Sequence, residues 1–190
     1  PFRTRLEQGP LVADGAMGTM LHAHHNLPIN SCFDLLNLTD PGWVAAVHRQ
    51  YIDAGAEIVE TNTFSANIFK LSSCDLQDQC AEINRAGVEL ARRVVDASFR
   101  EDVYVAGSVG PLGVRLAPFG RTTPEEAFEA FRIQTGALIE AGADLLIFET
   151  FSDLVEIEQA IRAARAIDET IPIIAQMTFT RDDRTTLGDT

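Results

Sequence analysis

Polar side chains that could bind a ligand or catalyse a reaction stand where short apolar runs of this sequence end. Residues 11–13 lead into Asp14 and Gly15, a pattern that predicts the exit of a buried strand followed by a tight turn. Other apolar runs end similarly, at Glu60-Thr61-Asn62-Thr63, at Ser108 and at Glu149-Thr150. Because α/β folds place their chemistry at the carboxyl ends of parallel strands, we expect these groups to form one site.

Helix signals separate these runs. A long helix is expected over residues 76–99, where apolar residues recur on one side. Residues 21–38 lack sustained periodicity and are expected to form a long connection. The signals that predict helix starts and stops are Asp40-Pro41 with Gly55, and the capping box Thr123-Pro124-Glu125-Glu126 with Gly142.

Two segments of the chain contain, in the same order, a helix end, a glycine, an apolar run and a terminal Glu-Thr. Gly55 stands five residues before Glu60, and Gly142 stands seven residues before Glu149. Because side chains alternate along a strand with period two, a difference of two residues keeps both glutamates on the same face. Repeated strand–helix units of this kind are typical of a barrel.

Five strands are expected, and their apolar runs predict a parallel sheet covered by helices. They are residues 11–14, 57–60, 103–109, 144–150 and 171–178. Polar groups at all five exits, the fifth being Thr178, favour a (β/α)₈ TIM barrel over a doubly wound sheet. Because such a barrel takes about 250 residues, we expect residues 1–190 to hold about the first five βα units of a single truncated barrel domain, incomplete at the C-terminus.

Composition narrows the class of protein. Acidic residues outnumber basic ones by 28 to 15, and 46% of the residues are hydrophobic. The formal net charge of −13 would repel phosphates, which argues against nucleic acid and anionic membranes as partners. The sequence shows neither a membrane-length apolar run nor a secretory leader, so we expect a cytoplasmic protein.

The cysteines and histidines give weak metal signals. Three cysteines form no C-x-x-C pair and are expected to be packed thiols: Cys32, Cys74 and Cys80. Three histidines cluster in the predicted connection without an adjoining thiol or carboxylate: His22, His24 and His25. We therefore expect no metal ligand among these six residues.

Four motifs in register resemble the homocysteine S-methyltransferase domain. They are Asp14-Gly15-Ala16-Met17-Gly18-Thr19, Glu60-Thr61-Asn62-Thr63-Phe64, Gly107-Ser108-Val109-Gly110-Pro111 and Phe148-Glu149-Thr150. In that family the domain is the first module of cobalamin-dependent methionine synthase and the whole of the enzymes that use betaine or S-methylmethionine. Residues 32–38 are similar to the form fused to a methylenetetrahydrofolate reductase.

The resemblance implies a methyltransferase that transfers a methyl group to the thiol of L-homocysteine and gives L-methionine, with Zn²⁺ as cofactor. In the family, three cysteines hold the zinc, and the zinc captures the substrate thiol as a nucleophilic thiolate. Those cysteines would lie beyond Thr190, so the resemblance assigns neither a metal ligand nor a catalytic side chain to this chain. Implied partners are a methyl donor (methylcobalamin, methyltetrahydrofolate, S-methylmethionine or betaine) and a fused reductase or cobalamin module.

The resemblance also assigns substrate-binding roles at the strand ends. Asp14 and Glu149 would face the amino group of homocysteine. Gly15 and the backbone of residues 61–63 would serve its carboxylate. The full set of expected substrate-binding residues is Asp14, Gly15, Glu60, Thr61, Asn62, Thr63, Ser108 and Glu149.

Structural roles for these residues are the alternative. Asp14 could cap the turn that follows it, and Glu149 could cap the helix that begins near Asp153. Glu60, Asn62 and Ser108 could satisfy backbone groups.

Two other functions stay open at this stage. One is a non-catalytic, truncated protein that at most binds an amino acid, because an incomplete barrel would leave sheet edges and apolar surface exposed. The other is a different TIM-barrel enzyme, such as a lyase acting on a phosphorylated substrate. The lyase is disfavoured because the sequence shows no late-strand phosphate loop and the chain is acidic.

Overall fold

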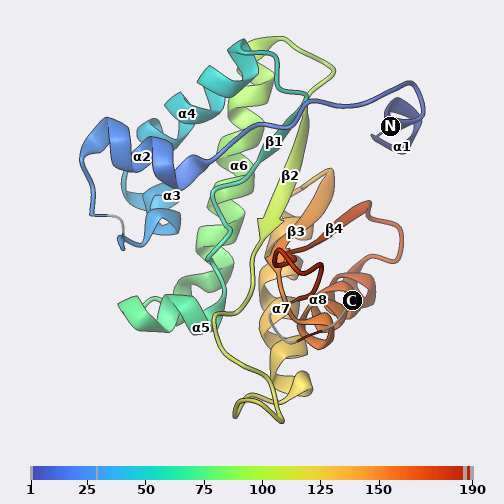
Figure 1. Cartoon of the computed structure of the whole chain (residues 1–190). Coiled ribbons are helices and arrows are strands. Elements are labelled where there is room, and N and C mark those ends of the chain that lie inside the picture. Colours follow the sequence, from blue (N-terminus) through green and yellow to red (C-terminus); the bar gives the residue numbers. More distant parts are fainter. Residues whose placement is uncertain (1, 29, 186–187, 189–190) are drawn as a thin grey trace.

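A computed structural model describes residues 2–28, 30–185 and 188 of the chain (Figure 1). Its strands form one sheet in the order β1-β2-β3-β4, and each neighbouring pair is parallel. The strands are β1 (Ile58–Glu60), β2 (Tyr104–Val109), β3 (Leu145–Phe151) and β4 (Ile173–Met177). The predicted parallel α/β architecture is therefore confirmed.

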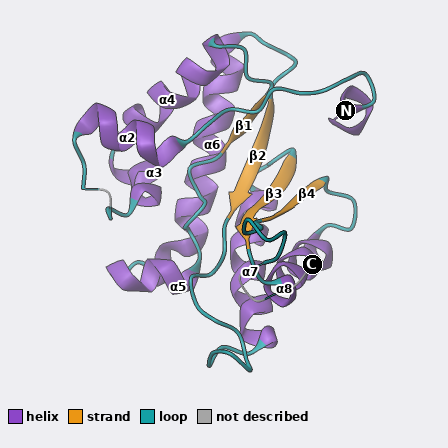
Figure 2. Ribbon diagram, viewed as in Figure 1, coloured by secondary structure: helices purple, strands orange, loops and turns teal. Residues whose placement is uncertain are grey.

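Helices alternate with the strands. The α-helices are α1 (Phe2–Leu6), α2 (Met17–His25), α3 (Leu36–Thr39), α4 (Pro41–Asp53), α5 (Ile68–Leu71), α6 (Cys80–Ser98), α7 (Pro124–Glu140) and α8 (Leu154–Ile167). The short 3₁₀ helices are η1 (Phe33–Leu35), η2 (Ser72–Cys74) and η3 (Gln77–Gln79). Figure 2 shows α6, α7 and α8 along one side of the strands, with α2, α3 and α4 beyond α6. Within the described ranges, no helix is long and apolar enough to cross a membrane.

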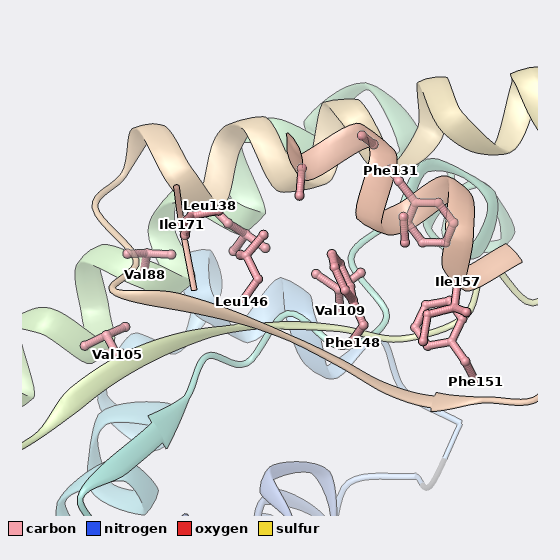
Figure 3. Close-up of a cluster of buried hydrophobic side chains, with 14 of the residues drawn as sticks. Val88, Val105, Val109, Phe131, Leu138, Leu146, Phe148, Phe151, Ile157 and Ile171 are labelled. Atoms are coloured by element: carbon pink, nitrogen blue, oxygen red, sulfur yellow. The ribbon is translucent and has the colours of Figure 1, made fainter. Parts of the chain in front are cut away.

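Side chains alternate between the two faces of the sheet. One face carries apolar residues that pack against α7 and α8 and are almost completely buried, among them Val109, Leu146 and Phe148 (Figure 3). The opposite face carries a smaller apolar cluster with Ile58, Ala106, Leu145 and Ile147. By the period of two, the same face carries Glu60, Ser108 and Glu149 at the carboxyl ends of the strands.

The predicted helix ends are largely confirmed. The Thr123 hydroxyl accepts a hydrogen bond from the Glu126 N–H (3.2 Å), and the Glu126 carboxylate accepts one from the Thr123 N–H (2.8 Å), which completes the capping box. Gly55 and Gly142 follow α4 and α7 with φ of 107° and 92°, as the end of a helix requires. Asp40 stands at the N-cap position of α4, but its side chain makes no capping hydrogen bond.

The prediction of a buried first strand was wrong. The chain around Ala13 runs beside β1, but it forms only an isolated parallel bridge to Ile58. Val12 is 58% exposed. Among the described residues, no strand pairs with the outer edge of this segment, so the segment gains hydrogen bonds from one side alone.

The prediction of a long connection over residues 21–38 was also wrong. This region contains the end of α2, followed by η1 and α3. Leu21 is fully buried and belongs to a cluster with Val44 and Val47 of α4. Packing against α4 therefore stabilises α2, whose polar histidines conceal the helical period in the sequence.

Two helix-interior glycines provide a test of the packing behind the predicted site. A Cβ atom at Gly87 of α6 would lie 2.6 Å from Thr63 Cγ2 and 2.9 Å from Asn37 Nδ2. At Gly136 of α7 the nearest atom would be Ile167 Cδ1, at 3.4 Å. We expect Gly87→Ala to lower the free energy of unfolding by about 1–3 kcal/mol through overpacking.

The matched control Gly136→Ala replaces glycine with a better helix former and should leave the free energy of unfolding unchanged or raise it by up to about 1 kcal/mol. Urea unfolding of both variants measures the difference. Equal stabilities of the two variants would contradict the tight packing at Gly87.

Candidate functional site

A cavity of about 990 Å³ lies at the carboxyl ends of β1, β2 and β3. Its walls come from the start of α2, the segment around η1, the loops after β1 and β2, and the end of β3. Seven of the eight residues expected from the sequence line it: Asp14, Gly15, Glu60, Thr61, Asn62, Ser108 and Glu149. Thr63, the eighth, is fully buried and does not line the cavity.

Three carboxyl groups meet at one wall of this cavity. Asp14 Oδ2 accepts a hydrogen bond from the Glu60 N–H (3.0 Å), whereas Asp14 Oδ1 is buried without a partner. Burial and the charge of Glu149 raise the pKa of Asp14 to about 7. Burial and the charges of Glu149 and Asp14 likewise raise the pKa of Glu60. The prediction that Glu60 and Glu149 share a face is confirmed, and no cationic side chain among the described residues forms an ion pair with the cluster.

Ser108 fixes the orientation of Glu149. The Ser108 hydroxyl donates a hydrogen bond of 2.6 Å to Glu149 Oε1. Glu149 does not cap the next helix, because Asp153 accepts the hydrogen bonds from the Val155 and Glu156 N–H groups (2.8 and 3.3 Å). The Glu149 carboxylate therefore lines the cavity instead of capping α8.

Thr61 and Thr63 join the ends of β1 and β2. Their hydroxyl groups are 2.6 Å apart, Thr61 Oγ1 accepts the Ser108 N–H (3.1 Å), and Thr63 Oγ1 donates to the Ser108 carbonyl (2.8 Å). From α7, the Gln134 side chain donates to the Thr63 carbonyl (2.8 Å). The two threonines thus hold the wall that carries Ser108.

Asn62 has a structural role in addition to its place in the wall. Its amide nitrogen donates hydrogen bonds to the Phe33 carbonyl (2.7 Å) and to Asn37 Oδ1 (3.1 Å). Asn37 in turn donates to the Asn62 carbonyl (2.8 Å). The paired amides attach the segment around η1 to the loop after β1.

The turn after Asp14 brings a helix N-terminus to the cavity. Glycine at position 15 is favoured by close approach rather than by positive φ, because a Cβ atom there would lie 2.9 Å from Tyr51 Oη and would displace the end of that side chain. Tyr51 also donates a hydrogen bond to the Ala16 carbonyl (3.1 Å). No side chain caps α2, and its first residues, Met17 and Gly18, line the cavity. Their N–H groups and the helix dipole favour a negatively charged group at this end.

The cysteines do not form a zinc site. Cys32 and Cys74 line the cavity, but Cys80 is buried and its thiol contacts the Ala66 carbonyl. Of the histidines, His25 stacks on Trp43. In the part of the chain that the structure describes, no group of three or more His, Cys, Asp or Glu side chains is placed to hold a metal ion. The residues described therefore do not fit Zn²⁺.

The sequence analysis missed a second part of the cavity wall. It contains Asp34, Phe64, Ser65 and Lys70. Asp34 accepts the Ser65 N–H (3.0 Å), and burial raises its pKa to about 6. The sequence does contain one signal for this region: Lys70 is the only lysine of the chain.

A cavity with polar walls at the carboxyl ends of a parallel, helix-covered sheet places this chain among the α/β proteins, which form their binding sites at that end of the sheet. Residues 11–190 match the Homocysteine S-methyltransferase family, and the chain belongs to this family.

Relatives and solved structures agree with this assignment. The methionine synthases of Mycobacterium tuberculosis and Mycobacterium leprae are each 34% identical to the chain over 96% of its length. The chain spans only 16% of either relative. The metallated form of the homocysteine methyltransferase MmuM from Escherichia coli has a TM-score of 0.85 and 26% identity, covering 100% of this chain and 70% of that one. Its oxidized form has a TM-score of 0.79 and 30% identity, with 95% and 65% covered.

The raised pKa of Asp14 predicts a pH-dependent effect of Asp14→Asn. In the folded protein Asp14 has a pKa of about 7, against an ordinary value of 3.8, so the wild type loses stability as the pH rises between these values. Asn cannot ionise and should retain the hydrogen bond from the Glu60 N–H. We therefore expect Asp14→Asn to stabilise the protein at about pH 8 and to have little effect near pH 4.

Asp102→Asn is the control of opposite sign. Arg100 lowers the pKa of Asp102, so the contribution of Asp102 to stability is present above its ordinary pKa and is lost as the pH falls through the lowered value. This variant should be destabilised near pH 8. Thermal unfolding across the pH range measures both, and an Asp14→Asn variant destabilised at pH 8 would refute buried charge repulsion at this wall.

Proposed function

We propose that the cavity binds the amino-acid end of L-homocysteine, and that the chain is the homocysteine-binding part of a methyltransferase that produces L-methionine. The observation that carries this proposal is the convergence of Asp14, Glu60 and Glu149 on one wall, beside the uncapped N-terminus of α2. Membership of the Homocysteine S-methyltransferase family supports the choice of amino acid and disfavours the lyase hypothesis.

The electrostatics of the cavity suit an α-amino acid. The ammonium group would supply a positive charge to the carboxyl cluster and would donate to Glu149 and to the unpartnered Oδ1 of Asp14. The carboxylate would accept hydrogen bonds from the turn at Gly15 and the start of α2. Glu60 and the oriented Ser108 hydroxyl complete the wall, whereas Thr61, Asn62 and Thr63 position it.

Thiol activation is not assigned to any described residue of this chain. In this family we expect Zn²⁺ to stabilise the substrate thiolate, but the described cysteines do not fit that ion. A metallated form is known for MmuM, and that finding concerns MmuM alone. The proposal for these residues is therefore binding and orientation of homocysteine, with a separate methyl donor as the second reactant.

We further propose that the sheet is an arc of an eight-stranded barrel and that residues 1–190 belong to a single domain. The strands are all parallel and follow one another in sequence order, as in a barrel. The fit to 70% of the MmuM chain supports a partial match to that fold.

Glu149→Gln tests the amino-group contact. The change removes the negative charge but preserves the shape of the side chain, so we expect binding of L-homocysteine to weaken about tenfold or more. Isothermal titration calorimetry on the chain measures the dissociation constant. In a complete enzyme the same change should raise the KM for homocysteine more than it alters the zinc content.

Glu129→Gln is the matched control, because Glu129 is exposed and pairs with Arg132 away from the cavity. It should bind homocysteine as the wild type does. If Glu149→Gln binds equally well, the assigned role of Glu149 is wrong.

The pH dependence of binding gives a second test. An ammonium group binds the ionised carboxyl cluster best, and the pKa of Asp14 is raised to about 7. We expect the affinity for L-methionine, which lacks an ionisable thiol, to increase several-fold between about pH 6 and pH 8. Asp14→Asn should bind more weakly and flatten this profile, and an unchanged slope in Asp14→Asn would remove Asp14 from the role.

A further inference from the structure

Lys70 forms a second charged region in the cavity wall. It is the only lysine among 190 residues and lies half-buried in the wall, at the end of α5. The charges that act on Lys70 are those of Asp34 and Glu156. By contrast, the charge of Glu149 acts on Asp14, and the charges of Glu149 and Asp14 act on Glu60. The cavity therefore has two separate electrostatic regions.

The structure fixes the position of the Lys70 side chain. Asn67 Oδ1 accepts the Lys70 N–H (3.0 Å) at the start of α5. The aliphatic stem lies against Gly113, where a Cβ atom would be 3.2 Å from Lys70 Cε. The ammonium nitrogen is 4.7 Å from the centre of the Phe64 ring. The stem and the ammonium group thus both contact the cavity wall, which lowers the entropic cost of binding a ligand there.

The ammonium group of Lys70 has unused hydrogen-bonding capacity. Its one hydrogen bond to a described residue is a long contact to Ser65 Oγ (3.4 Å), although an ammonium group has three donors. It forms no ion pair with any described carboxylate.

The two nearby acids have other partners. Asp34 Oδ1 accepts the Ser65 N–H, and Glu156 Oε1 accepts the Leu112 N–H (2.8 Å). Burial raises the pKa of Glu156 to about 7 and that of Asp34 to about 6, and neither carboxyl group forms an ion pair with Lys70. Lys70 is therefore available to an anionic ligand group.

The size of the cavity leaves space for that group. A volume of about 990 Å³ is at the upper end of the range for small-molecule sites, which is roughly 300–1,000 Å³, and exceeds the needs of one small amino acid. A methyl transfer needs both reactants in contact within one site.

We propose that Lys70 binds a carboxylate of the methyl donor, so that the acidic wall holds homocysteine and the Lys70 region selects a carboxylate-bearing donor. This inference rests on the proposed function, because it takes the second reactant to be a methyl donor. Ser65 supplies a second donor beside Lys70, and the Phe64 ring stabilises the ammonium group through a cation–π contact.

Binding to the complete chain, with the homocysteine region filled by saturating L-homocysteine, tests this assignment. The probes are glycine betaine, S-methyl-L-methionine and 5-methyltetrahydrofolate, each of which carries a carboxylate, and choline as the carboxylate-free match of betaine. At least one probe should bind, and Lys70→Met should weaken it about tenfold or more. Met retains the packed stem without the charge, and Lys70→Arg should stay within about threefold of the wild type.

The single lysine gives a second readout that does not depend on activity. Acylation of Lys70 by an amine-directed reagent can be followed by mass spectrometry of the peptide that contains it. The carboxylate probe that binds should protect Lys70 from acylation, and choline should not.

The two proposals fail in different ways. If Lys70→Met binds all three carboxylate probes as the wild type does, or if none of them binds or protects Lys70, the inference is overturned. The proposed function then still stands as long as Glu149→Gln loses homocysteine. If Glu149→Gln retains homocysteine, the proposed function itself fails.

Discussion

Repulsion among three carboxyl groups is the constraint on which the site depends. Asp14, Glu60 and Glu149 meet where water is scarce, and burial together with their mutual charge raises the pKa values of Asp14 and Glu60. Such a cluster opposes folding, so the apolar contacts between the strands and α6, α7 and α8 must offset its cost. The cavity is therefore poised for a cation, because a bound ammonium group would neutralise charge that the described side chains leave unpaired. Stability is given up at this wall in favour of binding.

Because β1, β2 and β3 are parallel neighbours, their carboxyl ends lie side by side and form one surface. Hydrogen bonds among Thr61, Thr63 and Ser108 lock the ends of β1 and β2 together, and Gln134 of α7 holds the same loop from behind. The absence of a side chain at Gly87 lets α6 approach this network. The hydroxyl and amide groups behind the cavity wall are buried and hydrogen-bonded to one another. This network holds the carboxyl groups at the surface of the cavity in position.

The sequence predicted the parts of the fold and site that follow from local periodicity. Glu60 and Glu149 were placed on one face by counting residues from Gly55 and Gly142, and a period of two leaves no other result. The helix α2 escaped prediction because its stability comes from contacts with α4 rather than from its own pattern. Lys70 escaped for a related reason: it lies on a short helix whose direction is set by contacts with distant residues, and no spacing in the sequence shows that it faces the cavity.

The contact between Gly15 and Tyr51 joins two positions that lie far apart in the chain. Tyr51 holds the Ala16 carbonyl and occupies the space that a side chain at Gly15 would need. The shape of the substrate-facing turn is thus determined partly by an aromatic ring on α4. A bulkier residue at position 15 would have to displace the Tyr51 hydroxyl, so we expect homologous sequences that lack this glycine to carry a smaller residue at position 51.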